Sequence, residues 1–192
     1  MKVLGIVCSP RKGGNTEILV REALEAVREA GGETELILVA DMNIAPCDGC
    51  GACDEDGTCR IEDDMQTVYQ QLELADGLIF GTPVYFLNVS AQAKAVMDRT
   101  YAFLRGGKLR GKVAAAIVAA RRVGAGQVLG LLYPYFTAQR MVIAGGGIGY
   151  GREKGEVRQG VGGSPSLSAV EEARAVGRNV VRMVKQLSGG AR

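Results

Sequence analysis

The chain has 192 residues, 47% of them hydrophobic, which is the length and composition of one globular domain with a sizeable core. Histidine is absent, which excludes mixed cysteine and histidine zinc sites and any histidine acid–base catalyst. The net charge is +2 and 5% of the residues are aromatic, so no basic, aromatic-interleaved module for nucleic acid is expected. We see no secretory leader pattern and no apolar run long enough to span a membrane, and we therefore expect a protein of the reducing cytoplasm with no membrane partner.

Apolar runs rich in β-branched residues alternate along the chain with segments of helical periodicity. The predicted strands are residues 2–7, 34–39, 77–81, 112–119 and 140–144. The predicted helices are residues 17–30, 62–74, 90–104, 127–138 and 165–187, the last with Pro165 in its first turn. This alternation is typical of the α/β class, and it predicts a parallel sheet with helices on both faces, joined by right-handed crossovers.

Residues 145–163 are rich in glycine and show no clear periodicity, so we expect a loop there, and the most mobile part of the chain. No internal repeat or linker divides the sequence. The organisation predicted is a single domain over residues 1–192 with a cysteine-rich segment at 47–59.

Four of the five cysteines, Cys47, Cys50, Cys53 and Cys59, lie within thirteen residues at C-x2-C-x2-C-x5-C spacing. The interspersed glycines would let the backbone turn tightly enough to aim several thiols at one point. Structural zinc sites usually separate two ligand pairs widely, whereas successive x2 spacings are more typical of a [4Fe–4S] cluster. Zinc, and metal-free thiols or disulfides, stay open as alternatives.

The loop after the first predicted strand has the composition of an anion site. Ser9, Arg11, Asn15 and Thr16 surround two glycines, Gly14 among them, and lead into a helix whose free N–H groups and dipole favour a phosphate. The loop fits neither the Walker A pattern nor the G-x-G-x-x-G fingerprint, which favours a mononucleotide. An ordinary turn capped by Asn15 or Thr16 is the simpler alternative.

The loops after the third and fourth predicted strands could enclose a flat ring. The first of them places Pro83, Tyr85 and Phe86 at the edge of the sheet where ligands bind in such folds, although both aromatics could be core residues. The second, residues 119–127, could offer backbone and cationic contacts to the other edge of the ring. Cys8, at the end of the first strand, is expected to be a packed thiol.

Taken together, these segments resemble a known family. The loop at 9–16 (SPRKGGNT) is similar to the FMN-phosphate loop of flavodoxin-like NAD(P)H-dependent FMN reductases. The stretch 82–94 (TPVYFLNVSAQAK), followed by MDR at 97–99, is similar to their isoalloxazine loop and the helix after it. With the cysteine run between them, the chain resembles the iron–sulfur flavoproteins.

That resemblance implies a flavodoxin-like three-layer doubly wound sandwich with a five-stranded parallel sheet in the order 2-1-3-4-5. It implies FMN and a [4Fe–4S] cluster as cofactors, a homodimer or homotetramer, and a small electron carrier such as ferredoxin as partner. The cluster ligands it implies are Cys47, Cys50, Cys53 and Cys59. The FMN-binding residues it implies are Ser9, Arg11, Asn15 and Thr16 at the phosphate and Pro83, Val84, Tyr85, Phe86 and Asn88 at the ring. Gly14, Ala120 and Gly124, from the loops described above, complete the predicted FMN-binding set.

The function expected from this set is an FMN-dependent oxidoreductase that passes electrons between FMN, the cluster and a carrier, from two adjoining redox centres and with no catalytic side chain. One alternative is an NAD(P)H-dependent FMN or quinone reductase without a cluster, for which NAD(P)H would be the donor. A second alternative is a non-enzymatic redox sensor.

Charge is distributed unevenly along the chain. Residues 1–100 contain 8 basic and 17 acidic residues, a net charge of −9, and residues 101–192 contain 15 and 4, a net charge of +11. Two differently charged faces of one domain would explain this distribution. Self-association through opposite patches, or docking of an acidic electron carrier on the basic side, would explain it equally.

Overall fold

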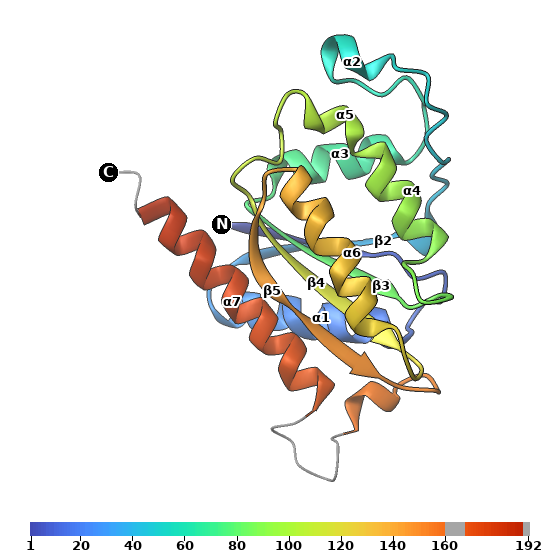
Figure 1. The fold of residues 1–192 in the computed structure, drawn as a ribbon. Helices are drawn as coiled ribbons and strands as arrows, with labels where there is room; N and C mark the ends of the chain where they lie inside the picture. Colours follow the sequence, from blue (N-terminus) through green and yellow to red (C-terminus); the bar gives the residue numbers. More distant parts are fainter. Residues whose placement is uncertain (160–167, 190–192) are drawn as a thin grey trace.

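The computed structural model describes residues 1–159 and 168–189 and contains one five-stranded parallel sheet in the order β2-β1-β3-β4-β5 (Figure 1). The strands are β1 (Lys2–Val7), β2 (Glu33–Leu38), β3 (Gly77–Pro83), β4 (Val113–Ala120) and β5 (Val142–Tyr150). The α/β class, the parallel sheet and the strand order are therefore confirmed.

Helices cover both faces of this sheet. One layer is formed by α1 (Asn15–Glu29) and α7 (Ala169–Gly189). The other layer is formed by α3 (Met65–Leu74), α4 (Ala91–Arg99), α5 (Tyr101–Leu104) and α6 (Ala125–Ala138). The single helix predicted over 90–104 is thus two helices that meet at Thr100. Shorter helical turns are η1 (Val39–Asp41), α2 (Cys53–Asp56) and η2 (Glu156–Arg158), whereas Pro165 lies outside the described residues.

Alternation along the central strands sends side chains into two separate cores. In β1, Leu4 and Ile6 pack with α3, α4 and α6, whereas Val3 and Val7 pack with α1 and α7. All eight residues of β4 are buried, as expected for a central strand covered on both faces. Among the described residues, no helix is both long and apolar enough to cross a lipid bilayer.

The prediction of a loop from residue 145 onward is wrong for its first six residues, because β5 continues to Tyr150. The glycines of this strand let neighbouring helices touch its backbone. A Cβ on Gly146 would lie 2.9 Å from the Leu129 side chain of α6, and one on Gly149 would lie 2.5 Å from Leu19 of α1. The glycine-rich composition of this segment is therefore typical of a loop, although the close packing of the helices requires a strand without side chains there.

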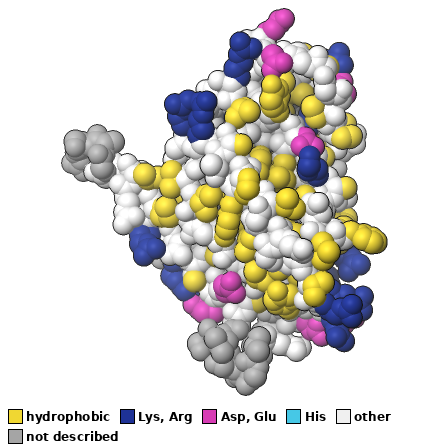
Figure 2. Space-filling model, viewed as in Figure 1, with side chains coloured by type: hydrophobic (Ala, Val, Ile, Leu, Met, Phe, Trp, Pro, Cys, Tyr) yellow, Lys and Arg dark blue, Asp and Glu magenta, His cyan; other side chains and the backbone are white. Residues whose placement is uncertain are grey.

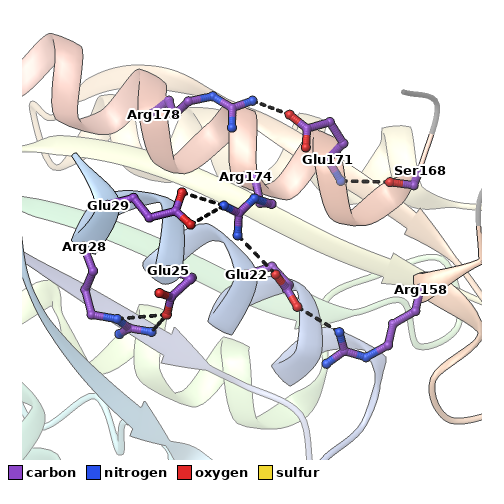
Figure 3. A network of polar contacts seen from close by, with 9 residues as sticks. All are labelled: Glu22, Glu25, Arg28, Glu29, Arg158, Ser168, Glu171, Arg174 and Arg178. Atoms are coloured by element: carbon purple, nitrogen blue, oxygen red, sulfur yellow. Dashed lines mark hydrogen bonds and ion pairs between the residues drawn. The ribbon is translucent and has the colours of Figure 1, made fainter. Parts of the chain in front are cut away.

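Close backbone contact and an ion-pair network join α7 to α1. Arg174 of α7 makes two hydrogen bonds to Glu29 (2.6 and 2.5 Å) and one to Glu22 (3.4 Å), and Glu22 also accepts from Arg158 of η2 at 2.8 Å (Figure 3). Because these pairs are exposed or half-buried, we assign them to the relative placement of the helices more than to stability.

Replacing Gly177 with alanine should destabilise the fold, because the added Cβ would lie 2.1 Å from the backbone oxygen of Ala23. We expect the free energy of unfolding to fall by about 1–3 kcal/mol, measured by urea denaturation. The matched control is Gly130→Ala in α6, where a Cβ meets nothing within 4 Å. That change should stabilise the helix by about 1 kcal/mol, and equal effects of both changes would contradict the close α1–α7 contact.

Candidate functional site

A cavity of about 270 Å³ lies at the carboxyl ends of the strands. The loops after β1, β3 and β4 enclose it, as predicted, together with residues 151–154 after β5. The predicted residues that line it are Ser9, Arg11, Gly14, Asn15, Thr16, Pro83, Val84, Tyr85 and Ala120. The lining residues outside the predicted set are Lys12, Ala119, Arg121, Gly151, Arg152, Glu153 and Lys154.

The start of α1 presents backbone donors to this cavity. The buried Glu17 carboxylate in its first turn accepts from the N–H of Gly13 (2.6 Å) and from Nε of Arg21 (2.8 Å). This contact closes the loop back on the helix in the manner of a capping box. Within residues 1–159 and 168–189, the N–H groups of Asn15 and Thr16 have no protein acceptor, which is the arrangement that binds anions at a helix start.

Positive charge surrounds the same cavity. Five of its lining residues are basic and one is acidic: Arg11, Lys12, Arg121, Arg152 and Lys154, with Glu153. The ammonium of Lys154 lies over the first loop, 3.5 Å from the backbone oxygen of Lys12, and a Cβ on Gly13 would come within 2.8 Å of it. In Figure 2 dark-blue side chains gather where the carboxyl ends of the strands lie in Figure 1. The site is therefore suited to a dianionic phosphate.

Asn15 has a different role from the one the sequence suggests. Its side-chain Nδ2 donates to the backbone oxygen of Glu153 (2.9 Å), and its Oδ1 accepts from the N–H of Gly155 (2.7 Å). Both ends of the amide are thus used to fix the turn after β5, which leaves the backbone N–H of Asn15 for an anion. The sequence analysis misses this turn because it ends the fifth strand at residue 144, whereas β5 continues to Tyr150. The carboxyl end of β5 therefore reaches the same edge of the sheet as the other loops of the cavity.

The loop after β3 forms a tight turn beside the cavity. Tyr85 and Asn88 exchange two backbone hydrogen bonds (2.9 and 3.0 Å), and between them Phe86 and Leu87 adopt positive φ angles of 47° and 62°. Phe86 is fully exposed, so it is not the core residue considered as an alternative. Phe86 and Asn88 do not line the cavity, unlike Pro83, Val84 and Tyr85.

Gly124 supports this turn from the loop after β4. It does not line the cavity, but a Cβ there would lie 2.9 Å from the side chains of both Val84 and Leu87. With a φ of 93°, its backbone conformation also favours glycine. Gly124 therefore contributes to the site by letting the β4 loop approach the β3 loop closely.

Ser90 links the loop after β3 to the end of β1. Its Oγ donates to the backbone oxygen of Cys8 (2.5 Å) and accepts from the N–H of Ala93 (3.1 Å), which caps α4. Its own N–H donates to Oγ1 of Thr82 at 3.2 Å. Cys8 is fully buried, as predicted, and burial raises the pKa of its thiol far above the usual value, so it is an inert packed thiol.

A second cavity, of about 260 Å³, is lined by Cys47, Cys50, Cys53 and Cys59 together. All four are free thiols: the first two are exposed, and the other two are half-buried against the core. Burial and the Asp54 carboxylate raise the pKa of the Cys53 thiol, and the nearby Cys59 and Cys47 act in the same direction. The chain thus offers four soft sulfur donors around one hollow, which fits an iron–sulfur cluster or zinc chemically.

The thiols line the hollow without converging on one point. Within the described ranges, no three or more cysteine or carboxylate side chains are placed to hold a single metal ion. The backbone of the segment can turn tightly, because Gly49, Gly51 and Gly57 all have φ near 70° (69°, 72° and 75°). Cys47 and Cys50 are also exposed, so their side chains can rotate toward a bound group.

A buried ion pair anchors the cysteine segment to α4. The Arg99 side chain is 0% exposed and the Asp63 side chain 6%, and the two make hydrogen bonds of 2.7 and 3.0 Å. Asp63 also accepts from the N–H groups of Ala45 (2.8 Å) and Met65 (3.0 Å). Burial alone would raise the pKa of Asp63, but these donors lower it below its ordinary value. Burial likewise opposes the charge of Arg99, but Asp63 and then Cys59 raise its pKa above the usual value.

The lining residues place the two cavities at opposite ends of α4, the helix labelled in Figure 1. Pro83, Val84 and Tyr85 precede its first residue, whereas Arg99 is its last residue and lines the cysteine cavity. A nine-residue helix is about 14 Å long, and the two cavities share no lining residue. The two centres predicted to adjoin would therefore occupy separate cavities of one chain.

Replacing Asp63 with asparagine should leave the buried charge of Arg99 without its partner and lower the free energy of unfolding at pH 7 by about 3–5 kcal/mol. Because the folded-state pKa of Asp63 is depressed, its contribution is complete above the unfolded value of 3.8 and is lost as pH falls through the folded value. Urea denaturation of chelator-treated protein at a series of pH values measures this. The difference in free energy of unfolding between wild type and Asp63→Asn should shrink as the pH falls below 3.8.

The control for this change is Asp48→Asn. Asp48 forms an exposed ion pair with Arg60 at 2.6 Å beside the same cavity, and its loss should leave stability unchanged. A gap between wild type and Asp63→Asn that stays constant from pH 7 to pH 3 would contradict the assigned role of the carboxylate.

Comparisons with known proteins agree with this geometry. The profile of the NADPH-dependent FMN reductase family matches residues 1–153. An iron–sulfur flavoprotein of Methanocaldococcus jannaschii is 41% identical, with 96% of this chain and 98% of that protein covered. An iron–sulfur flavoprotein of Methanosarcina thermophila is 37% identical, with 76% and 78% covered.

Solved structures at low identity support the fold. RosB with its bound intermediate 8-demethyl-8-formylriboflavin-5'-phosphate has a TM-score of 0.80 at 17% identity, over 100% of this chain and 82% of that one. A WrbA-like protein of Agrobacterium tumefaciens has a TM-score of 0.63 at 16% identity, over 96% and 97%. The chain thus belongs to the NADPH-dependent FMN reductase family and, within it, to the iron–sulfur flavoproteins, and it is a flavin-dependent oxidoreductase.

Proposed function

We propose that this protein passes electrons between FMN bound at the carboxyl ends of the strands, a [4Fe–4S] cluster bound by the four clustered cysteines, and a small carrier such as ferredoxin. The observation that carries the FMN half is the free N–H groups at the start of α1, which face a cavity with five basic side chains. When bound, FMN supplies two-electron exchange and the cluster supplies one-electron exchange.

For FMN, the chain's own part is binding and orientation. The N–H groups of Asn15 and Thr16, with Arg11 and Lys154, would hold the phosphate. Pro83, Val84 and Tyr85 would border the ring, and the Ser90 bonds fix this loop relative to the first. No side chain is needed as a nucleophile or acid–base catalyst.

For the cluster, Cys47, Cys50, Cys53 and Cys59 would be the ligands. Four free thiols around one hollow support this proposal, as does their joint attachment to the fold through Arg99 and Asp63. The names of the relatives point the same way.

The partner of this protein would include a second copy of itself. Tyr85, Phe86 and Leu87 form an exposed apolar turn beside the FMN cavity. Val123 in the loop after β4 and Tyr150 at the end of β5 are also exposed. Hydrophobic side chains are conspicuous over this side of the molecule in Figure 2. Such a patch is suited to a homodimer or homotetramer contact that would cover the flavin.

A reductase without a cluster is the second candidate, with NAD(P)H as donor and free FMN or a quinone as acceptor. The observation that favours it is that the four thiols do not converge on one point among the described residues. A relative from Deinococcus radiodurans that is 30% identical, with 65% of this chain covered, is named NAD(P)H dehydrogenase (quinone). Metal analysis separates the two candidates.

Replacing Arg11 with alanine should weaken FMN binding about 10- to 100-fold, because one charge-assisted contact to the phosphate is lost. Riboflavin lacks the phosphate, so its affinity should be unchanged. Fluorescence titration of the flavin-free protein with each ligand measures both. The control is Arg122→Ala, a neighbouring cation that does not line the cavity. Equal losses for FMN and riboflavin would rule out the phosphate assignment.

Anaerobically purified wild-type protein should contain about four iron and four sulfide per chain together with FMN, measured by colorimetric iron and sulfide assays, by metal analysis and by absorbance. Cys50→Ser should lose iron and keep FMN, because the two cavities share no residue. Cys8→Ala, which removes the one cysteine outside the cluster segment, should keep both. Zinc in place of iron would favour the second candidate, and full iron retention in Cys50→Ser would exclude that cysteine as a ligand.

A further inference from the structure

Arg99 is the most completely enclosed charged side chain described in the protein. An arginine has five N–H donors. Four of those of Arg99 are used: Nη1 donates to Asp63 (2.7 Å) and to the backbone oxygen of Ala45 (2.9 Å), and Nη2 donates to Asp63 (3.0 Å) and to the backbone oxygen of Ile61 (3.2 Å). The position and orientation of the guanidinium are thus fixed by Ala45, Ile61 and Asp63, which flank the cysteine segment on both sides.

The fifth donor, Nε–H, is buried and has no acceptor within residues 1–159 and 168–189. An unpaired buried donor costs about 1–3 kcal/mol, and more when it carries charge, so a reason for it is expected. Arg99 and Cys59 both line the cavity of the four cysteines, and the Ile61 carbonyl that Arg99 holds is two residues after Cys59. The Tyr69 hydroxyl is a second donor nearby, but it already donates to the backbone oxygen of Arg99 at 2.6 Å.

We propose that the Nε–H of Arg99 is kept free to donate a hydrogen bond to the sulfur of Cys59 when that sulfur is a cluster ligand. Arg99 would then be a positioning residue, which orients this thiolate and raises the reduction potential of the cluster. Hydrogen bonds to the sulfurs are among the determinants of iron–sulfur potentials, and partners of ligands typically act in this way. The inference rests on the proposed cluster and adds a residue that the cysteine pattern does not include.

The geometry explains why arginine, and not lysine, stands at this position. The planar fork satisfies one carboxylate and two carbonyls with its terminal nitrogens and still has Nε–H as a fifth donor. A lysine has three donors on a single nitrogen and cannot supply five. Arg99→Lys therefore keeps the charge while it removes the proposed bond.

Arg60 provides a matched control at the same cavity. It also lines the cysteine hollow, but its side chain is 60% exposed and pairs with Asp48 at 2.6 Å. Arg60→Gln removes a positive charge near the thiols without disturbing a buried contact. Effects of charge alone should appear in this variant, and effects of the Nε–H bond should not.

The decisive experiment uses the intact protein labelled with ¹⁵N-arginine, reduced by one electron at its cluster and measured by pulsed electron–nuclear double resonance. We expect a ¹⁵N coupling of the size given by an N–H donor to a ligand sulfur, present in wild type and unchanged in Arg60→Gln. No coupling in either protein, or a coupling that disappears in Arg60→Gln, would overturn the proposal. This test does not depend on any variant at Arg99 being able to fold.

The second measurement is the cluster potential, followed by electron paramagnetic resonance during redox titration. Arg99→Lys should lower the potential by more than Arg60→Gln does, with the flavin content unchanged. A potential equal to that of wild type in Arg99→Lys with a full complement of iron would also overturn the proposal. Wild-type protein without iron would overturn the proposed cluster and this inference together, whereas a loaded cluster without ¹⁵N coupling overturns only the inference.

Discussion

Parallel pairing of all five strands is the constraint that creates the cavity proposed for the flavin. It brings the carboxyl ends of β1, β3, β4 and β5 to one edge of the sheet, so four loops from distant parts of the sequence must face one another. The loops then need only small local devices to form a cavity. Glu17 folds the loop after β1 back on α1, and Asn15 holds the turn after β5. Ser90 links the loop after β3 to the end of β1. Each of these side chains is occupied by backbone partners, which leaves the free N–H groups of α1 and the surrounding cations for a ligand.

The cysteine segment obeys a different rule, because it has almost no regular structure of its own. Irregular backbone that approaches the core must find partners for its polar groups. Here one buried pair supplies them: Arg99 takes the carbonyls of Ala45 and Ile61, and Asp63 takes the N–H groups of Ala45 and Met65. The two charged side chains thus make the hydrogen bonds to the backbone that a neighbouring strand would otherwise make. Such a pair is costly to desolvate, so its value here is in fixing one arrangement of the segment more than in added stability.

The sequence alone was sufficient for the features that depend on local pattern. The alternation of apolar runs predicted the sheet and both helical layers, and nine of the twelve residues predicted to bind FMN line one cavity. The misses have a common cause. The glycines of β5 are there because Leu19 and Leu129 pack against bare backbone, and the true partners of Asn15 are more than a hundred residues away. The enclosure of Arg99 likewise depends on Asp63, thirty-six residues earlier. Contacts of this kind leave no periodicity at the residue concerned, so only the fold reveals them.

The fold also gives the uneven charge of the sequence a spatial meaning. The acidic run Asp54, Glu55 and Asp56 forms α2 in the cysteine segment, whereas the cations of the flavin cavity come from the first loop and from the loops after β4 and β5. These two groups lie at opposite ends of α4, so an acidic partner would be attracted to the end proposed for the flavin and repelled by α2 at the other. Negative charge beside the cysteines would also lower the potential of a bound cluster, whereas the Nε–H of Arg99 would raise it. The buried donor is shielded from salt and the exposed carboxylates are not, so the balance between them would shift with ionic strength in favour of the arginine.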